Sequence, residues 1–297
     1  MQSDNLRGIV LLIVAMGFFA ATDTCLKLAS DAMPKGQVLF FLGIGGGAIF
    51  AALTLATRQA VFALDFFRPA MILRNAAEIV ATFSFLTALA AVGLSLASAI
   101  IQATPLGVTF FAVILLGEKV GWRRWSAILV GLFGVLVILR PGLQGFEAGA
   151  LWAVTAMLAL SVRDVSTRLL PATTPSTRIA MYGMLMSAPT GLLHMALVDP
   201  WVPLTAAGMW PMAGGVIFGA LGYYAMVQAM RVGEISVVAP FRYTRILFAL
   251  TLGWLVFSEE PDLLTYLGCA ITIGAGLYSF LREARLARRA ARAQAAT

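Results

Sequence analysis

Charged residues are scarce in this chain of 297 residues: only 12% are Asp, Glu, Lys or Arg, whereas soluble domains carry about 25%. There is one histidine, there are two cysteines, and there is no HExxH, GxSxG or Walker-type sequence. Two cysteines without metal-ligand spacing indicate neither a zinc site nor a disulfide. A hydrolytic serine or cysteine would need His194 as its base, and no orienting acid accompanies it. These absences argue against an enzyme, a bound cofactor or metal, and direct use of ATP.

Long apolar runs are abundant instead. Hydrophobic residues make up 60% of the chain, the mean hydropathy is +0.90, and runs of about 20 residues, enough to cross a bilayer, recur from end to end. They lack the alternation of a membrane β-barrel, and only helices or closed barrels satisfy their backbone in lipid. We therefore predict an all-α membrane protein with ten transmembrane helices, at 7–30, 38–57, 70–91, 95–116, 125–140, 148–170, 177–198, 208–230, 234–257 and 263–281.

Basic residues gather at two places, the C-terminal segment 282–297 and the short connection after the fourth run. Such clusters are typical of cytoplasmic connections, so the formal charge of +7 indicates a membrane topology rather than nucleic-acid binding. The first run is too long for a signal-peptide core. We expect a multi-pass protein of a bacterial cytoplasmic membrane with both termini in the cytoplasm, and a basic tail that touches anionic lipid.

The chain also repeats itself at a fixed offset. An acid recurs at 164 − 23 = 141 positions, and three further matches have the same spacing. The matched residues are Asp23 and Asp164, Lys27 and Arg168, Pro34 and Pro175, and Glu118 and Glu259. Each half, 1–145 and 146–281, holds five predicted spans, and an odd number requires opposite orientations in the membrane. The basic connection EKVGWRR and its acidic counterpart SEEPD agree with inversion, which is typical of secondary transporters that bind cargo near the midplane.

Two corresponding stretches, ASAIIQATPLGVTFFAVILLGEKVGWRRW and VVAPFRYTRILFALTLGWLVFSEEPDLLTYLG, carry a resemblance to a known family. Together with the plan of five plus five helices they resemble the EamA-type branch of the drug/metabolite transporter superfamily, over residues 7–281. The resemblance implies transport of a metabolite or drug by alternating access through a central cavity. The segment LRNAAE is similar to the arginine-bearing third helix of relatives that carry S-adenosylmethionine or similar metabolites.

Ionisable residues inside spans are functional candidates. Three acid–base pairs are spaced i,i+4, so each pair lies on one face of its helix and can neutralise itself. They are Asp23–Lys27, Arg74–Glu78 and Asp164–Arg168. Two interpretations stay open for them: ion pairs that ease burial, or gating and coupling groups, with Asp23 and Asp164 at equivalent positions of the two halves.

Arg163, Arg242 and Arg245 remain without such an acid, and Arg245 lies near the middle of its span. Snorkelling toward headgroups is the alternative for Arg163 and Arg242, and it fits Arg245 poorly. Because a guanidinium fork suits a carboxylate or phosphate, the predicted cargo is a small anionic or zwitterionic metabolite. We expect these arginines, Arg74 and Tyr243 to bind it.

The offset relates Tyr243 and Arg245 to Gln102 and Thr104, which precede Pro105 in the fourth span. A proline there frees a backbone carbonyl, so we add Gln102 and Thr104 to the predicted site. Spans four and nine should line it, joined by spans one, three and six. Some aromatic side chains could stack on a cargo ring, although packing and interfacial belts explain them equally: Phe83, Trp152, Tyr182, Tyr223, Tyr224 and Trp254.

Other functions remain as alternatives: an exporter of cationic or neutral compounds that uses the acids as ligands, a channel, and an intramembrane enzyme. Proton coupling through Asp23, Glu78 or Asp164 is a further hypothesis. Gly43-x-x-x-Gly47 and Gly215-x-x-x-Gly219 have the spacing of close helix contacts. They predict an interface inside a monomer or, as the alternative, between the copies of a homodimer.

Overall fold

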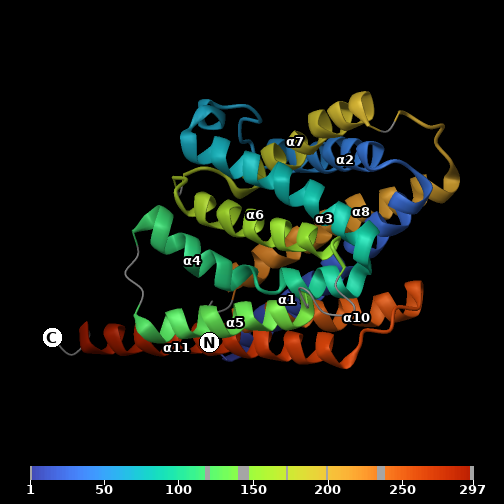
Figure 1. Cartoon of the computed structure of the whole chain (residues 1–297). Coiled ribbons are helices and arrows are strands. Elements are labelled where there is room, and N and C mark those ends of the chain that lie inside the picture. The colour runs from blue at the N-terminus through green and yellow to red at the C-terminus, as the bar shows by residue number, and fades with distance from the viewer. Residues whose placement is uncertain are drawn as a thin grey trace.

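The computed structural model describes residues 2–117, 121–139, 147–171, 173–198, 200–232 and 238–294. The regular secondary structure of these residues is entirely helical, without a strand. The helices follow the long apolar runs of the sequence and pack into one bundle (Figure 1). Their bounds are α1 Gln2–Ala32, α2 Lys35–Ala56, α3 Pro69–Ile101, α4 Thr104–Leu116, α5 Trp122–Leu139, α6 Ala150–Arg168, α7 Ser176–Leu197, α8 Ala206–Val232, α10 Thr244–Phe257 and α11 Leu263–Gln294, with short 3₁₀ helices η1 Leu64–Phe67 and η2 Ala239–Tyr243.

The expected all-α fold is confirmed, and the differences lie at the third, fourth and ninth spans. The third and fourth runs share α3, which is interrupted at Gly93 (φ +83°, ψ 174°). The fourth span is interrupted again at Gln102 and Ala103, before α4 begins. The ninth span is η2 followed by α10, and residues 233–237 at its expected start lie outside the described residues. By length and composition, α1, α2, α3, α8 and α11 are sufficient to cross a membrane.

The helices pack mainly in pairs, and each pair joins an early helix to a late one. The main pairs are α1 with α8, α2 with α7, α3 with α6, and α5 with α11. Helix α4 also packs on α6, and α10 on α1. Figure 1 shows α2 beside α7 and α5 beside α11 at opposite sides of the bundle. Residues before and after position 145 are therefore interleaved in a single bundle.

Glycine permits two of these contacts. A Cβ added at Gly43 would collide with the backbone of Ala188 on α7, and Gly47 faces Leu185 on the same helix. Gly215 of α8 faces Leu26 of α1. Both GxxxG spacings therefore serve contacts within the chain, as expected where backbones approach closely.

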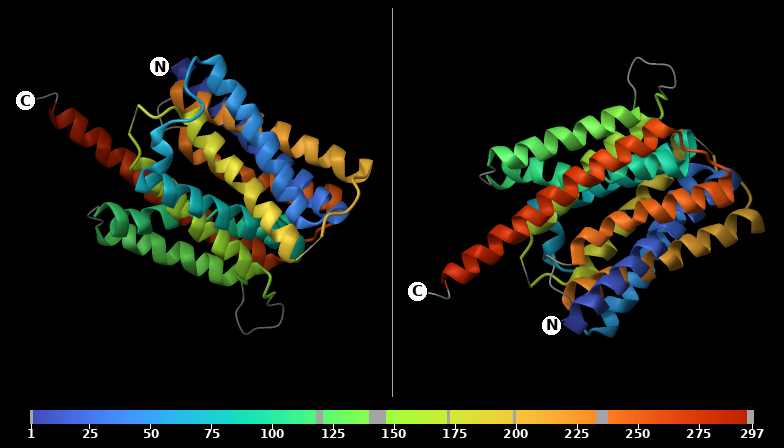
Figure 2. Two further views of the ribbon diagram at one scale, coloured as in Figure 1. Left: turned by 90° about the horizontal axis from the view of Figure 1, so that it is seen from above. Right: turned by 90° about the horizontal axis from the view of Figure 1, so that it is seen from below.

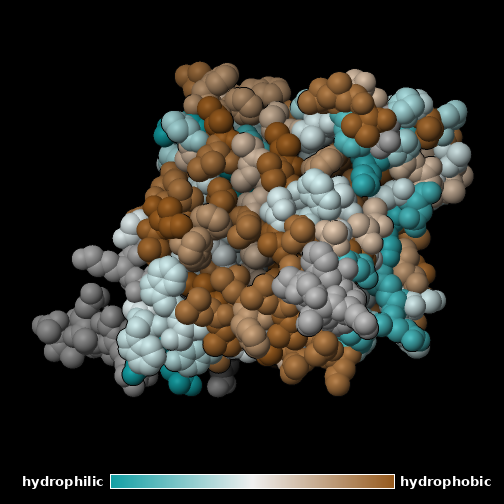
Figure 3. Space-filling model, viewed as in Figure 1, coloured by the Kyte–Doolittle hydropathy of each residue, from teal (hydrophilic) through white to brown (hydrophobic). Residues whose placement is uncertain are grey.

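The outer surface is largely apolar on the face shown in Figure 3. Exposed side chains such as Leu129, Phe133 and Leu136 of α5 fit a surface that contacts lipid. Both views of Figure 2 show the C-terminal part of α11 projecting beyond the bundle, in the segment predicted to be the basic tail.

The Gly43 contact makes a test of the packing. Replacing Gly43 with Ala forces α2 and α7 apart, because the new methyl group meets the backbone of Ala188. Overpacking of this kind costs about 1–3 kcal/mol, so the purified variant should melt at a lower temperature in detergent. Gly274→Ala is the matched control, because nothing lies within 4 Å of a Cβ at that position. Equal melting temperatures for the two variants would contradict the predicted close packing.

Candidate functional site

Arg245 lies between α10 and α1 and is not an isolated charge. Its Nη2 donates to Asp23 Oδ2 at 2.6 Å, and its guanidinium stands 5.7 Å from the ring of Phe19 and 6.0 Å from that of Phe85. Its Nε has no hydrogen-bond partner among the described residues. Asp23 is buried and faces α10, where Arg245 is its partner. The predicted Asp23–Lys27 pair is therefore wrong, since Lys27 contacts Glu259.

Four charges of α3 and α6 form a second group, which we call the four-charge cluster. Arg163 Nη2 contacts Asp164 Oδ1 at 2.7 Å, and its Nη1 contacts Glu78 Oε1 at 3.2 Å. Glu78 Oε2 also accepts from Arg74 Nη2 at 2.7 Å. The Arg74–Glu78 pair is thus present as predicted. Asp164 pairs with Arg163, so Arg163 has a local acid that the spacing rule overlooked.

Within the cluster the two arginines are occupied by protein. Arg163 donates through Nε, Nη1 and Nη2, and Arg74 donates to Asn75 as well as to Glu78. Arg242 of η2 differs, because it is exposed and the described residues give it no hydrogen bond or salt bridge. Of the predicted arginines, Arg242 and Arg245 keep the most free donors.

The interruptions in the fourth and ninth spans meet. Gln102, where α3 ends, donates from Nε2 to the carbonyl oxygen of Tyr243 at 3.2 Å, between residues 141 positions apart. Thr104 turns its hydroxyl to the carbonyl of Ile101, and its own carbonyl accepts from Ser161. The Tyr243 hydroxyl is buried without a partner among the described residues. Two broken helices therefore bring polar backbone to one place, next to Arg245 and Arg242.

A third polar group surrounds Glu259, in the turn between α10 and α11. Its carboxylate accepts from Lys27 Nζ at 2.5 Å, from Leu94 N at 2.7 Å and from Ser95 N at 2.7 Å. We call these three donors the Glu259 cradle. The sequence did not indicate the contact between Glu259 and Lys27, because the two residues are 232 positions apart. Only the offset of 141 between Glu118 and Glu259 marked this acid.

The cradle shifts the acidity of Glu259. Burial by itself raises the pKa of this carboxyl, but hydrogen bonds from Lys27, Ser95 and Leu94 outweigh burial and lower the pKa below its ordinary value of 4.5. The carboxylate is consequently ionised at neutral pH and can stay paired with Lys27.

The remaining candidates fall into three groups. Arg168 ends α6 and is exposed, and Glu118 lies outside the described residues. Among the aromatic candidates, Phe83 packs edge-on against Trp152, and Tyr182 is buried with its hydroxyl at Ala63. Tyr224 and Trp254 are 56% and 61% exposed, which favours the interfacial or lipid-facing interpretation.

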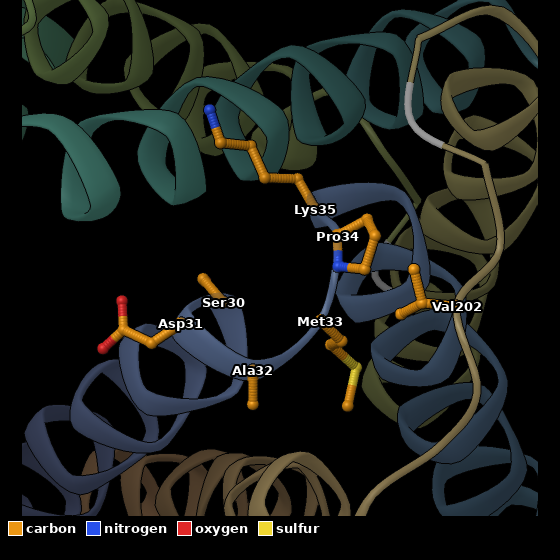
Figure 4. A pocket seen from close by; sticks show the side chains of 7 residues that line it. All are labelled: Ser30, Asp31, Ala32, Met33, Pro34, Lys35 and Val202. Atoms are coloured by element: carbon orange, nitrogen blue, oxygen red, sulfur yellow. The ribbon is translucent and has the colours of Figure 1, made fainter.

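A shallow pocket opens at the end of α1, beyond Lys27 (Figure 4). Its lining residues come from the end of α1, the turn to α2, the first residue of α2 and the segment before α8: Ser30, Asp31, Ala32, Met33, Pro34, Lys35 and Val202. The charged groups of Asp31 and Lys35 point in different directions, so they do not converge on a ligand. Among the described residues no three His, Cys, Asp or Glu side chains are grouped as metal ligands.

The bundle of apolar helices with charged and interrupted segments in its interior defines a multi-pass membrane transporter. The chain belongs to the EamA-like transporter family, whose model matches residues 6–140 and 147–281. Both ends of the second match lie 141 positions after those of the first (147 − 6 and 281 − 140). The family confirms the predicted resemblance, and the chain is a transporter and not an enzyme.

Three relatives are named as transporters of different compounds. A riboflavin transporter of Vibrio cholerae is 32% identical over 59% of this chain and 58% of its own length. The pseudopaline exporter CntI of Pseudomonas aeruginosa is 26% identical over 90% and 93% of the two chains. An S-adenosylmethionine uptake transporter of Rickettsia prowazekii is 23% identical over 61% of each chain. The chain thus spans less than two thirds of the riboflavin and S-adenosylmethionine relatives.

A solved crystal structure shares the fold. It aligns over 96% of this chain and 99% of its own, with a TM-score of 0.65 and 21% sequence identity.

The four-charge cluster predicts a large penalty for losing its central acid. Glu78→Gln leaves both Arg74 and Arg163 short of compensation in the interior, and breaking a buried pair costs about 3–5 kcal/mol. Denaturant titration of the purified protein in micelles should show this loss. Asp31→Asn, which removes an exposed carboxylate, should change stability by about 0.5 kcal/mol or less. Similar losses in both variants would contradict the structural role of Glu78.

The Glu259 cradle predicts a pH-dependent stability. Because the folded-state pKa lies below the ordinary value of 4.5, the contribution is complete above that value and is lost as pH falls through the folded pKa. The melting temperature of the native protein should exceed that of Glu259→Gln at pH 7, and the difference should shrink below pH 4.5. The exposed neighbour supplies the control: Glu260→Gln should show no such trend. A difference that grows toward low pH would contradict the assignment.

Proposed function

We propose that the chain carries a small anionic or zwitterionic metabolite across the cytoplasmic membrane by alternating access, with Arg245 as its principal ligand. The observation that carries this proposal is the environment of Arg245: one mid-span guanidinium, held by Asp23 through a single nitrogen, with Nε unpartnered among the described residues. A guanidinium has five donors, so a carboxylate or phosphate of the cargo can bind on the side that Asp23 leaves open.

The surroundings of Arg245 support the same cargo. Phe19 and Phe85 flank the guanidinium and would exclude water from a bound anion. The charge of Arg242, which has no ion-pair partner among the described residues, adds positive potential on the same span, while Arg74 and Arg163 are neutralised by Glu78 and Asp164. We assign Arg245 and Arg242 to binding, together with the neighbouring Gln102 and Tyr243. We assign Arg74, Arg163 and Thr104 to structural contacts.

Alternating access through two inverted halves, 1–145 and 146–281, is supported by the helix pairs. The spans are numbered one to ten in chain order, so that α1, α3, α6 and α8 are spans one, three, six and eight. When each span is exchanged with the span five positions away, the α1–α8 pair becomes the α6–α3 pair. The same exchange turns α4–α6 into α10–α1, and all four pairs occur. Two hydrogen bonds join residues that this exchange relates, Gln102 to Tyr243 and Thr272 to Gly131, each 141 positions apart. Contacts between equivalent residues are expected along a twofold axis.

The proposed orientation places both termini in the cytoplasm, because the basic clusters after α4 and in the tail mark that side. The basic tail would then lie at the cytoplasmic surface, where anionic lipid is available.

Ligand-dependent melting tests the cargo charge. Purified protein is heated with panels of anionic, zwitterionic and cationic metabolites, since a ligand of the folded state stabilises it by about 2.7 kcal/mol at a hundred times its Kd. We expect stabilisation by members of the anionic or zwitterionic panel and its loss in Arg245→Gln.

A second variant separates binding from folding. Because Arg245→Gln leaves Asp23 buried and unpaired, the double variant Asp23→Asn/Arg245→Gln removes both charges and should recover the melting temperature without recovering the ligand response. Arg58→Gln, in the connection after α2, is the control that keeps the response. Stabilisation by cations alone, unaffected by Arg245→Gln, would favour the alternative in which Asp23 binds a cationic cargo.

A further inference from the structure

We propose that Glu259 is a gating residue: its carboxylate closes the end of the bundle opposite the N-terminus, and it must leave its cradle before cargo can pass there. This inference rests on the alternating-access cycle of the proposed function. It assigns the cycle a contact that lies outside the Arg245 site.

The cradle joins elements that are distant in sequence at one end of the molecule. Glu259 follows α10, Lys27 belongs to the last part of α1, and Leu94 and Ser95 restart α3 after its interruption. Lys27 Nζ also stands 3.9 Å from the ring centre of Phe257. These elements cannot separate without breaking three charge-assisted hydrogen bonds, which are stronger than neutral ones.

The backbone is shaped to receive this carboxylate. Gly93 has φ +83°, a conformation that residues with a Cβ rarely adopt. It places Leu94 N and Ser95 N at the start of a helical segment, where both donate to Glu259. A Cβ at Gly93 would collide with Glu259 Oε1, and a Cβ at Gly253 would lie 2.7 Å from Oε2. Helix N-termini favour negative charge, and here another span supplies it.

The position of the cradle indicates a gate rather than a permanent fastening. Lys27 lies one helical turn beyond Asp23 on the same face of α1, so the cradle lies between the Asp23–Arg245 pair and the end of the bundle. The side chains of Lys27 and Glu259 are 14% and 17% exposed, which gives water a path to replace the lost hydrogen bonds on opening.

At an offset of 141 positions the sequence repeats the residue types of the cradle, and in the proposed inverted arrangement this second set belongs to the opposite end of the bundle. Lys27 corresponds to Arg168, Glu259 to Glu118 and Ser95 to Ser236. Glu118 and Ser236 lie outside the described residues, so the correspondence is one of sequence. A symmetric carrier needs one gate at each end, and this chain repeats the acid, the base and the serine.

Labelling from each side of the membrane tests the gate without knowledge of the cargo. Phe19→Cys, four residues before Asp23 on α1, is placed in a chain carrying Cys25→Ser and Cys269→Ser, and vesicles of each orientation receive a membrane-impermeant maleimide. Glu259→Gln removes one partner of the charge-assisted contacts, so we expect it to raise the rate of labelling at position 19 about tenfold. The increase should occur only from the side of the cradle. Glu260→Gln should leave the rate unchanged. An unchanged rate in folded Glu259→Gln protein would overturn the gate.

A reversible lock covers the case in which Glu259→Gln fails to fold. Lys27→His/Glu259→His, in the same background, should bind Zn²⁺ between the two imidazoles, whose combined reach is similar to that of the Lys27–Glu259 contact. Zn²⁺ should stop labelling at position 19 from the cradle side, and a chelator should restore it. Labelling that continues with Zn²⁺ bound would overturn the gate. If both labelling results are as expected but Arg245→Gln keeps its response to anionic metabolites, the proposed cargo site fails and the gate stands.

Discussion

Charge that is buried among lipid-facing helices has to be compensated by the protein itself, and this constraint organises the interior of the bundle. A guanidinium stays charged at any accessible pH, and hydrocarbon offers it no water. Accordingly Arg245 reaches across to α1 for Asp23, and Arg163 reaches across to α3 for Glu78. Each pair links an early helix to a late one. The contacts that neutralise these charges therefore also join the two parts of the chain. Any movement between those parts must alter these contacts.

Interrupted helices follow from the same constraint. A continuous helix hides its backbone polar groups, whereas an interruption leaves donors or acceptors that need partners. At Gly93 the partner is the carboxylate of Glu259, and at Tyr243 it is the amide of Gln102. In both cases one part of the chain supplies the group that the other lacks. Such contacts can be exchanged for water or for a ligand, which a hydrogen bond inside a regular helix cannot be without unwinding it.

Hydropathy predicted the helices well, and helix periodicity predicted one ion pair, Arg74–Glu78. The periodicity failed for Asp23 because it states which residues share a face, not which neighbouring helix that face meets. Arg245 is 222 positions from Asp23, and only the packing of α10 on α1 brings them together. The repeat offset did single out Gln102 and Tyr243, which are 141 positions apart and hydrogen-bonded in the structure. Gly93 ended the third predicted span correctly, but its left-handed backbone was not visible in a sequence where glycine is common.

The Asp23–Arg245 pair also explains how loading could be coupled to movement. Separating the pair in a dry interior leaves two uncompensated charges, which is costlier than keeping it. A bound anionic cargo would lower that cost, because it would offer Arg245 a second carboxylate or phosphate, and Asp23 could then separate without leaving the guanidinium uncompensated. Asp23 lies on α1 one turn from Lys27, whose partner is Glu259. In the proposed cycle, a shift of α1 that follows the exchange at Arg245 would act directly on the cradle, because α1 carries both Asp23 and Lys27.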